Sequence, residues 1–314
     1  MVFTRKEIFM NVAFRVDIST EIGTGHYTRM SSLAEVFTGD GHFCKFFKSK
    51  DEPIDYSKYN IIILDSYELN NEYIAKLNDP NRLVVCCDDN ANYTYNCDVV
   101  LNPNLYSYEI KIKTAVKTPN MLLGGKYALL RKEFRESYPI KIRKNANHIF
   151  VCFGGSDLRN MTPKVIKTLR NIKGVKLSVV LGKYTKNNEE VAALESENVS
   201  VYKTPKRISE IMNSCDIAVT ASGSMINELA VLGIPTITIT QAENQFLLTE
   251  FLVRKSLIKS AGNWINTDFE FLRKIVVSLL SNYDNRRTIS RRIQKMVDKN
   301  GAYNSAYEIL KMIY

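Results

Sequence analysis

One of the three histidines in this chain stands where a proton acceptor would be useful. His26 follows the segment Ile22-Gly-Thr-Gly25, between a predicted strand and a predicted helix over residues 30–37. Imidazole is the side chain best suited to take up a proton at neutral pH, so His26 is a candidate general base. The alternative is a histidine that only caps or packs against the helix. His42 is interpreted as a turn residue and His148 as a strand residue.

The glycine segment before His26 resembles a ligand-binding loop but lacks the full dinucleotide fingerprint. Gly23 and Gly25 permit a tight turn, and the N–H groups at the start of the helix can face an anion or polar group. Thr28 stands where the third glycine would be, so NAD binding is disfavoured. Arg15 and Asp17 precede this loop and, together with Gly25, are candidate substrate contacts.

Polar residues follow three more predicted strands of the first half. Asp65 could orient a sugar hydroxyl or His26, and Tyr67 could stack or hydrogen-bond, unless the two form only a strand-end turn with an exposed tyrosine. Asp88-Asp89 and Asn102-Pro-Asn104 end the next two strands in the same way. The adjacent carboxylates of Asp88-Asp89 point to opposite sides, so they do not form a ready-made acid/base pair. A structural Asx turn explains them equally well. Asn102 is a further candidate substrate contact.

The second half contains a glycine loop after another buried run. Gly154, Gly155 and Ser156 offer backbone N–H groups and a hydroxyl, which suit a diphosphate although no P-loop lysine is present. A simple Gly-Gly turn is the alternative.

A second candidate anion site follows later in the same half. Ser222 and Ser224 stand at the start of a predicted helix, and Glu228 lies one turn further on. A helix N-terminus binds anions, and a carboxylate can hold vicinal ribose hydroxyls. Asn244 and Gln245 add amides after the next strand. These residues together predict a nucleotide diphosphate site.

The elements that must position these residues alternate between strands and helices, which predicts an α/β fold with parallel sheets. We expect domains at residues 1–140 and 141–314, joined near the polar, basic stretch 138–147, with a ligand cleft between them. The C-terminal segment 285–312 has the periodicity of one or two helices. The predicted strands are 10–16, 43–47, 61–64, 83–87 and 99–101, followed by 148–153, 176–181, 199–202, 217–220 and 236–240.

The charge balance is basic but uneven. The 314 residues carry a net charge of +10, and residues 251–314 hold 12 basic and 5 acidic side chains. A non-specific nucleic-acid binder would need a basic groove along the whole protein, so nucleic acid is not an expected partner. The basic tail is interpreted as a solvated helix face, and a peripheral contact with a membrane surface stays open.

The cysteines and the apolar runs indicate a cytoplasmic protein. The six cysteines show no C-x-x-C spacing and mostly lie in apolar runs, which predicts reduced core thiols. The N-terminal segment does not have the pattern of a signal peptide, and no uncharged run is long enough to span a membrane. No metal or cofactor is expected, and the oligomeric state is not predicted.

Four motifs have been described: the loop before His26, the strand end at Asp65, the Gly154-Gly155 loop and the segment from Ser222 to Glu228. In this order they resemble the UDP-sugar hydrolases of pseudaminic acid biosynthesis (the PseG family), relatives of the MurG-type glycosyltransferases. The family cleaves UDP from UDP-2,4-diacetamido-2,4,6-trideoxy-β-L-altropyranose. The matching segments are Phe14-Arg-Val-Asp17, Ile22-Gly-Thr-Gly-His26, Asp65-Ser-Tyr67, Asp88-Asp89, Cys97-Asp98, Leu101-Asn102, Tyr127-Ala-Leu-Leu-Arg131, Phe153-Gly-Gly-Ser-Asp157, Ser222 to Glu228 and Asn244-Gln245.

The resemblance implies two Rossmann-like domains in a glycosyltransferase-B arrangement and a metal-independent, inverting hydrolysis. The family's essential histidine falls on His26, as general base toward water, and its active-site tyrosine falls on Tyr67. UDP would be held by Gly154, Gly155, Ser156, Ser224 and Glu228. This chain differs from compact members of the family, since it continues for about 69 residues past Gln245.

Two other functions compete with this hydrolase. An inverting, MurG-like glycosyltransferase would have the same architecture, because the fold alone does not separate transfer from hydrolysis. A basic, non-enzymatic binding protein is a remote alternative from another class. Release of free sugar without an acceptor would favour the hydrolase over both.

Overall fold

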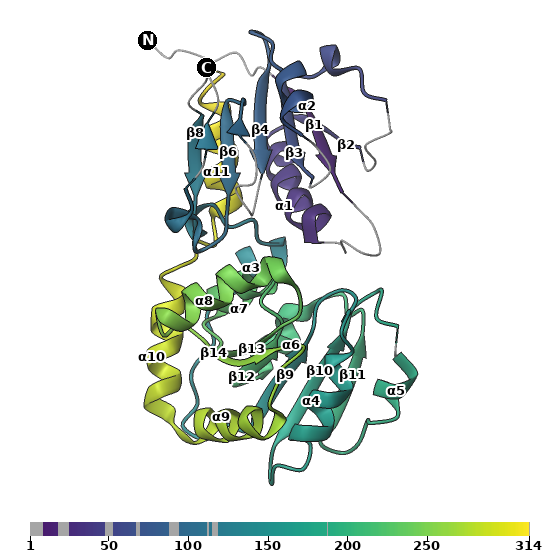
Figure 1. Ribbon diagram of the computed structural model, residues 1–314, viewed down its shortest axis with the longest axis vertical. Coiled ribbons are helices and arrows are strands. Elements are labelled where there is room, and N and C mark those ends of the chain that lie inside the picture. Colours follow the sequence, from purple (N-terminus) through teal and green to yellow (C-terminus); the bar gives the residue numbers. More distant parts are fainter. Residues whose placement is uncertain are drawn as a thin grey trace. The chain divides into compact units, whose positions relative to one another are not determined.

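The chain folds into two compact units (Figure 1). The computed structural model describes residues 9–17, 25–47, 53–66, 70–87, 94–111, 113–114, 119–186 and 188–313. The first unit consists of Met1–Pro103, Ser107–Arg131 and Asn300–Tyr314, and the second unit of Asn104–Tyr106 and Lys132–Lys299.

The first unit is built on six parallel strands in the order β2-β1-β3-β4-β6-β8. Alternate residues of β1 point to opposite faces, as strand geometry requires. Phe14 packs in the cluster that contains residues of α1 and α11, whereas Ala13 packs in the cluster beside α2. The elements are β1 (Asn11–Val16), α1 (Gly25–Gly39), β2 (Phe43–Phe47), β3 (Ile61–Asp65), α2 (Asn71–Lys76), β4 (Leu83–Cys87), β5 (Thr94–Tyr95), β6 (Val99–Asn102), β7 (Lys113–Thr114), β8 (Asn120–Leu123) and α11 (Gly301–Leu310).

The second unit also has a six-stranded parallel sheet, in the order β11-β10-β9-β12-β13-β14. Apolar residues of α4 and α9 pack in one cluster with residues of the strands. The elements are α3 (Lys132–Arg135), β9 (His148–Cys152), α4 (Met161–Leu169), β10 (Lys176–Leu181), α5 (Asn188–Ala192), β11 (Val199–Lys203), α6 (Ile208–Ser214), β12 (Ile217–Thr220), α7 (Met225–Leu232), β13 (Thr236–Thr240), α8 (Phe246–Arg254), β14 (Lys259–Asn263), α9 (Phe269–Ser281) and α10 (Tyr283–Gln294).

The predicted α/β class is confirmed, and every strand predicted from the sequence is present. The strands β5, β7, β8 and β14 were not predicted. β5 and β7 have two residues each, the edge strand β14 has no apolar run, and that of the edge strand β8 is only three residues long, Met121 to Leu123. The predicted C-terminal helices correspond to α10 and α11.

The division into units differs from the expected boundaries of 1–140 and 141–314. The main segment of the second unit begins at Lys132, and α11 belongs to the first unit. Ala302, Ala306 and Ile309 of α11 are buried in the same cluster as residues of α1. The chain therefore enters the second unit and returns to the first.

A buried arginine holds the start of α10 against neighbouring backbone. Arg286 is fully buried, and its Nη1 donates to the carbonyl oxygens of Leu279 (2.7 Å) and Leu280 at the end of α9. Its Nη2 donates to the carbonyl oxygens of Arg143 (2.8 Å) and Lys144 (3.0 Å). Arg286 thus belongs to the interior, although the sequence placed it among the residues of a solvated basic face.

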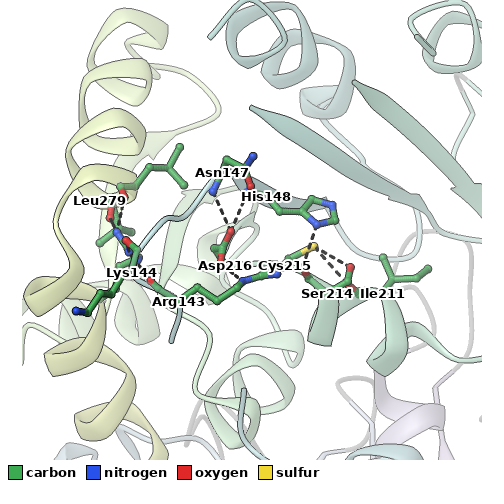
Figure 2. A network of polar contacts seen from close by, with 11 residues as sticks. Arg143, Lys144, Asn147, His148, Ile211, Ser214, Cys215, Asp216 and Leu279 are labelled. Atoms are coloured by element: carbon green, nitrogen blue, oxygen red, sulfur yellow. Dashed lines mark hydrogen bonds and ion pairs between the residues drawn. The ribbon is translucent and has the colours of Figure 1, made fainter. Parts of the chain in front are cut away.

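A second buried charged residue, Asp216, lies near Arg286, directly before β12 (Figure 2). Asp216 accepts hydrogen bonds from the backbone N–H groups of Asn147 and His148, each at 2.9 Å, and from Arg143 Nε at 2.6 Å. Burial raises the pKa of the neighbouring Cys215 thiol to about 12, so this cysteine is protonated and behaves as a core residue. All six cysteines lie in the described ranges, and none forms a disulfide.

Among the described helices, none is both long enough and apolar enough to cross a membrane.

Candidate functional site

His26 belongs to a buried cluster of three charged or titratable side chains in the first unit. Its Nδ1 lies 2.6 Å from Asp65 Oδ1. Arg29 binds the same carboxylate with two hydrogen bonds, from Nε to Oδ2 at 2.6 Å and from Nη2 to Oδ1 at 2.5 Å. The side chain of Asp65 is 1% exposed and that of Arg29 is 12% exposed. A histidine, an aspartate and an arginine therefore form one compact group.

The short contact with Asp65 fixes the tautomer of His26. Carboxylate oxygens only accept hydrogen bonds, so the proton of the neutral ring must be on Nδ1. Arg29 Nη2 lies 3.1 Å from the same nitrogen. In this tautomer both of those groups are donors, so their contact is not a hydrogen bond. The basic lone pair of the ring is then on Nε2, and His26 has the arrangement of a general base oriented by a carboxylate.

Asp65 is held in its charged form by its neighbours. Burial by itself raises the pKa of Asp65, but the positive charge of Arg29, the interaction with His26 and the hydrogen bonds from both outweigh burial. The pKa of Asp65 is consequently well below its ordinary value. Asp65 is ionised at neutral pH and can keep accepting the His26 proton donor.

The topology of the sheet brings this cluster together. Asp65 is the last residue of β3 and pairs with Val16 of the neighbouring strand β1. The strand order reverses between β1 and β3, because β2 lies on one side of β1 and β3 on the other. Ligands of open α/β sheets bind at such a reversal, beyond the carboxyl ends of the strands. His26 lies in the first turn of α1, which begins at Gly25 rather than at residue 30 as expected.

The other predicted residues of the first unit are less directly joined to His26. The backbone N–H of Asp17 donates to the Asp65 carbonyl at 3.2 Å, so Asp17 adjoins the cluster. Arg15 is 3% exposed, and its guanidinium lies 5.9 Å from the centre of the Tyr73 ring. Asn102 is fully buried at the end of β6.

Four residues of the first unit that were named from the sequence cannot be placed in this way. Tyr67, Asp88 and Asp89 lie outside the described residues, as does Gly23. Gly25 is described, and within the described part of the chain no side chain lies within 4 Å of where its Cβ would be, apart from those of its chain neighbours.

In the second unit, the predicted glycine loop follows β9. Gly154 has a φ of +80°, a conformation that favours glycine, and among the described residues none beyond its chain neighbours has an atom within 4 Å of the position of a Cβ. Gly155 and Ser156 are half-buried beside it. The loop is therefore a glycine turn that is open beside Gly154 and packs closely against Gly182 on its other side.

The helix that follows this loop is already capped. Asp157 Oδ1 accepts the backbone N–H of Met161 and Oδ2 that of Thr162, each at 2.9 Å. Gln241 Nε2 donates to Asp157 Oδ1 at 3.2 Å. The carboxylate thus occupies the N-terminus of α4, whereas the side chain of Ser224 makes no capping hydrogen bond at the N-terminus of α7.

The segment before α7 contacts the residues that follow β13. Thr249 Oγ1 donates to Ser222 Oγ at 2.7 Å. Gln245 Oε1 accepts the backbone N–H of Gln241 at 2.9 Å, and Gln245 Nε2 lies 4.0 Å from where a Cβ of Gly223 would be. Gln245 therefore lies beside the Ser222–Ser224 segment.

The predicted nucleotide residues consequently gather at one edge of the second sheet. They follow β9, β12 and β13, which are hydrogen-bonded neighbours, and the strand order reverses between β9 and β12. Ser224 and Asn244 are exposed, whereas Glu228 is 9% exposed within α7. The predicted residues of the second unit thus lie at its reversal point, as His26 and Asp65 do in the first unit, whereas Asn102 ends β6 away from that point.

Three residues of these clusters were not singled out from the sequence. Arg29 stands one helical turn after His26, and this spacing was a usable signal because such residues share a helix face. Asp157 stands four residues before Met161, where α4 begins, and an Asp at such a position commonly accepts N–H groups of the helix start, whereas Gln241 gave no signal because its partner Asp157 comes from a separate segment. Within the described ranges, no group of three or more His, Cys, Asp or Glu side chains could hold a metal ion.

Residues 136–304 match the profile of a family described as "Protein of unknown function (DUF354)". The chain belongs to this family. An uncharacterized relative from Methanocaldococcus jannaschii is 26% identical over 275 residues, which cover 75% of this chain and 57% of that protein. The chain thus spans little more than half the length of that relative.

Another relative of this DUF354 protein has a named activity. The UDP-2,4-diacetamido-2,4,6-trideoxy-beta-L-altropyranose hydrolase of Campylobacter jejuni is 24% identical over 274 residues, covering 78% of this chain and 97% of that protein. Among solved structures, MurG of Acinetobacter baumannii is similar with a TM-score of 0.67 and 12% identity, over 96% of this chain and 100% of that chain. The fold is therefore that of the MurG-like proteins, with two Rossmann-like units.

Proposed function

We propose that this protein hydrolyses UDP-2,4-diacetamido-2,4,6-trideoxy-β-L-altropyranose to UDP and the free sugar, with His26 as the general base. The His26–Asp65–Arg29 cluster carries the proposal, because it supplies an oriented base at the ligand-binding edge of the first sheet. The relative from Campylobacter jejuni named for this activity supports the choice of substrate.

The chemistry follows from the tautomer of His26. The Nε2 lone pair takes a proton from water as the water oxygen forms a bond to the anomeric carbon. The bond between that carbon and the β-phosphate oxygen breaks, and UDP leaves with the bonding electrons. Attack from the face opposite UDP inverts the anomeric configuration. Asp65 compensates the positive charge that develops on the imidazole.

In this proposal the second unit holds UDP. Backbone N–H groups of the Gly154-Gly155 turn and of the first turn of α7 face the diphosphate, with the hydroxyls of Ser156, Ser222 and Ser224. Glu228 receives the ribose hydroxyls, and Asn244 and Gln245 supply amides. Arg15, Asp17, Gly25, Tyr67 and Asn102 are the proposed sugar contacts of the first unit. The reaction as proposed requires no metal ion.

The experiment is a screen of UDP-sugars for UDP release in the presence of EDTA, with the sugar product followed by NMR. We expect turnover of the diacetamido sugar and an initial product with inverted configuration. His26→Ala should lower kcat by about 10²–10⁴-fold, the usual worth of a general base. The matched control is His148→Gln, because His148 lies in the second unit and contacts Ser178 and Ser214.

Two results would contradict this proposal. One is full turnover by His26→Ala; the other is no UDP release from any sugar in the screen. The fold likeness to MurG favours a glycosyltransferase as the second candidate. UDP release that depends strictly on an added acceptor would decide for transfer.

A further inference from the structure

Exposed apolar side chains adjoin the single tryptophan of the chain, in the second unit. Phe246, which contacts Trp264, is 40% exposed, and Ile265, which follows Trp264, is 78% exposed. Leu158 and Leu247, which are sequence neighbours of Arg159 and Phe246, are 57% and 50% exposed. Trp264 itself is partly buried. We name these five residues and Arg159 the tryptophan shelf. Apolar patches with a polar border mark sites of binding.

Contacts between the side chains hold the shelf together. The rings of Phe246 and Trp264 stack with centroids 5.9 Å apart and an interplanar angle of 28°. The guanidinium of Arg159 lies 4.8 Å from the centre of the Trp264 ring. The shelf thus combines aromatic surface with a cation whose N–H groups can donate hydrogen bonds.

The shelf adjoins the proposed nucleotide residues. The backbone N–H of Trp264 donates to the carbonyl of Thr240, the last residue of β13, at 2.9 Å. Arg159 Nε lies 3.5 Å from the carbonyl oxygen of Gln241, whose side chain binds Asp157. Phe246 directly follows Gln245, which lies beside Gly223. The shelf therefore continues the same sheet edge.

We propose that the tryptophan shelf binds the apolar groups of the substrate's sugar, an inference that rests on the proposed function. A 2,4-diacetamido-2,4,6-trideoxy sugar carries a methyl group on each acetamido group and a third at C6. These methyl groups fit the exposed rings and aliphatic side chains, and Arg159 can donate to an acetamido carbonyl. A sugar with hydroxyls at these positions would leave the apolar side chains of the shelf exposed to water.

The size of the effect follows from the area that the methyl groups bury. Each buried methyl contributes about fourfold to affinity, at roughly 0.8 kcal/mol per group. Two methyl groups on the shelf would therefore favour the diacetamido sugar by about 15-fold over a hydroxylated one. The shelf then determines which nucleotide sugar is bound, while the glycine loops hold any UDP group.

Because Trp264 is the only tryptophan, its fluorescence reports directly on the shelf. In the His26→Ala protein, which binds without rapid turnover, UDP and the UDP-diacetamido sugar are titrated by calorimetry and by tryptophan emission. We expect both ligands to bind, and only the sugar nucleotide to change the emission strongly.

Substitutions then separate the shelf from the rest of the site. In the same background, Phe246→Ser should weaken binding of the sugar nucleotide by about tenfold and leave UDP affinity unchanged. Phe271→Ser is the matched control, because Phe271 is 46% exposed on α9, outside the shelf, and should change neither affinity. Circular dichroism checks that each variant is folded.

Each outcome bears on the proposal. If both ligands bind but Phe246→Ser binds the sugar nucleotide as tightly as its parent does, and the emission is insensitive to the sugar, the shelf is not a sugar site and the proposed hydrolase stands. If neither ligand binds the parent, the shelf proposal and the proposed function both fail. Capture of a protein partner by the shelf without any effect of the sugar would also overturn the inference.

Discussion

Asp65 owes its charge to the residues around it, and Arg29 is the main one. Without the guanidinium, burial would favour the neutral carboxylic acid. One of its oxygens would then carry a proton, and the two oxygens could no longer both act as acceptors. A neutral Asp65 would orient His26 poorly and would not compensate an imidazolium ion. Arg29 is in this sense a positioning residue that acts through Asp65.

We expect Arg29→Gln to lower kcat by about 10-fold or more with little change in UDP affinity, because the base loses its fixed orientation. Loss of Arg29 also raises the pKa of Asp65, so activity should fall at a higher pH than in the parent as the solution is acidified. Arg29→Lys, which keeps the charge, should restore part of the activity.

The measurement is the pH dependence of kcat for the three proteins, with UDP affinity from calorimetry. If Arg29→Gln shows the parental pH profile and only a lower melting temperature, the role of Arg29 is purely structural.

At the residue scale, the sequence indicated the right partners where the chemistry is local to a strand end. His26 and Asp65 were both candidates because each follows a buried strand, and the possible contact between them was part of that interpretation. Arg29 was missed because an arginine in a helix is ordinarily a surface residue. Its burial depends on β3, which is 36 residues away from it in sequence.

At the scale of elements, runs of β-branched and apolar residues predicted the central strands and the edge strands β2 and β11, while the edge strands β8 and β14 were not predicted. β14, with the sequence Lys259-Ser-Ala-Gly-Asn263, has one fully buried side chain, so its sequence does not differ from that of a loop. Its place is determined by β13, with which it pairs. An edge strand of this kind is specified by its neighbour more than by its own residues.

Arg286 shows how a helix can be fixed by a single side chain. Its four hydrogen bonds satisfy the carbonyl groups at the end of α9 and in the segment that leads to β9. Carbonyls at a helix end have no partner within the helix, and burying them unpaired costs free energy.

We therefore expect Arg286→Met to lower the free energy of unfolding by about 3 kcal/mol or more, since it leaves several buried acceptors unpaired. Urea unfolding followed by circular dichroism measures this loss. Arg287→Met is the matched control, because Arg287 is exposed on the same helix and its replacement should change stability by less than about 0.5 kcal/mol. Equal stability of the two variants would show that Arg286 does not fix α10.

At the scale of the whole molecule, two histidines outside the proposed site couple stability to pH. Burial lowers the pKa of His42, with Asp40 opposing it, and burial also lowers the pKa of His148. His42 Nδ1 accepts the backbone N–H of Met10 at 3.1 Å, which a protonated ring cannot do. The folded protein thus prefers both rings to be neutral.

The sign of the pH effect follows from these two shifts. Below the ordinary histidine pKa of about 6.5, the unfolded chain binds protons that the folded protein does not, so the free energy of unfolding falls as the pH decreases. Urea unfolding at pH 7.5 and pH 5.5 should show lower stability at the acid value. His42→Gln combined with His148→Gln should reduce the difference, and an unchanged difference would rule out these histidines as its source.

The return of α11 to the first unit has a consequence for synthesis of the chain. The first unit contains the earliest residues, yet its apolar cluster includes Ala302, Ala306 and Ile309. On the ribosome, this cluster is completed only after all of Lys132–Lys299 has been made. The second unit can therefore finish folding before the first. Until α11 has been synthesised, part of the apolar core of the first unit stays exposed.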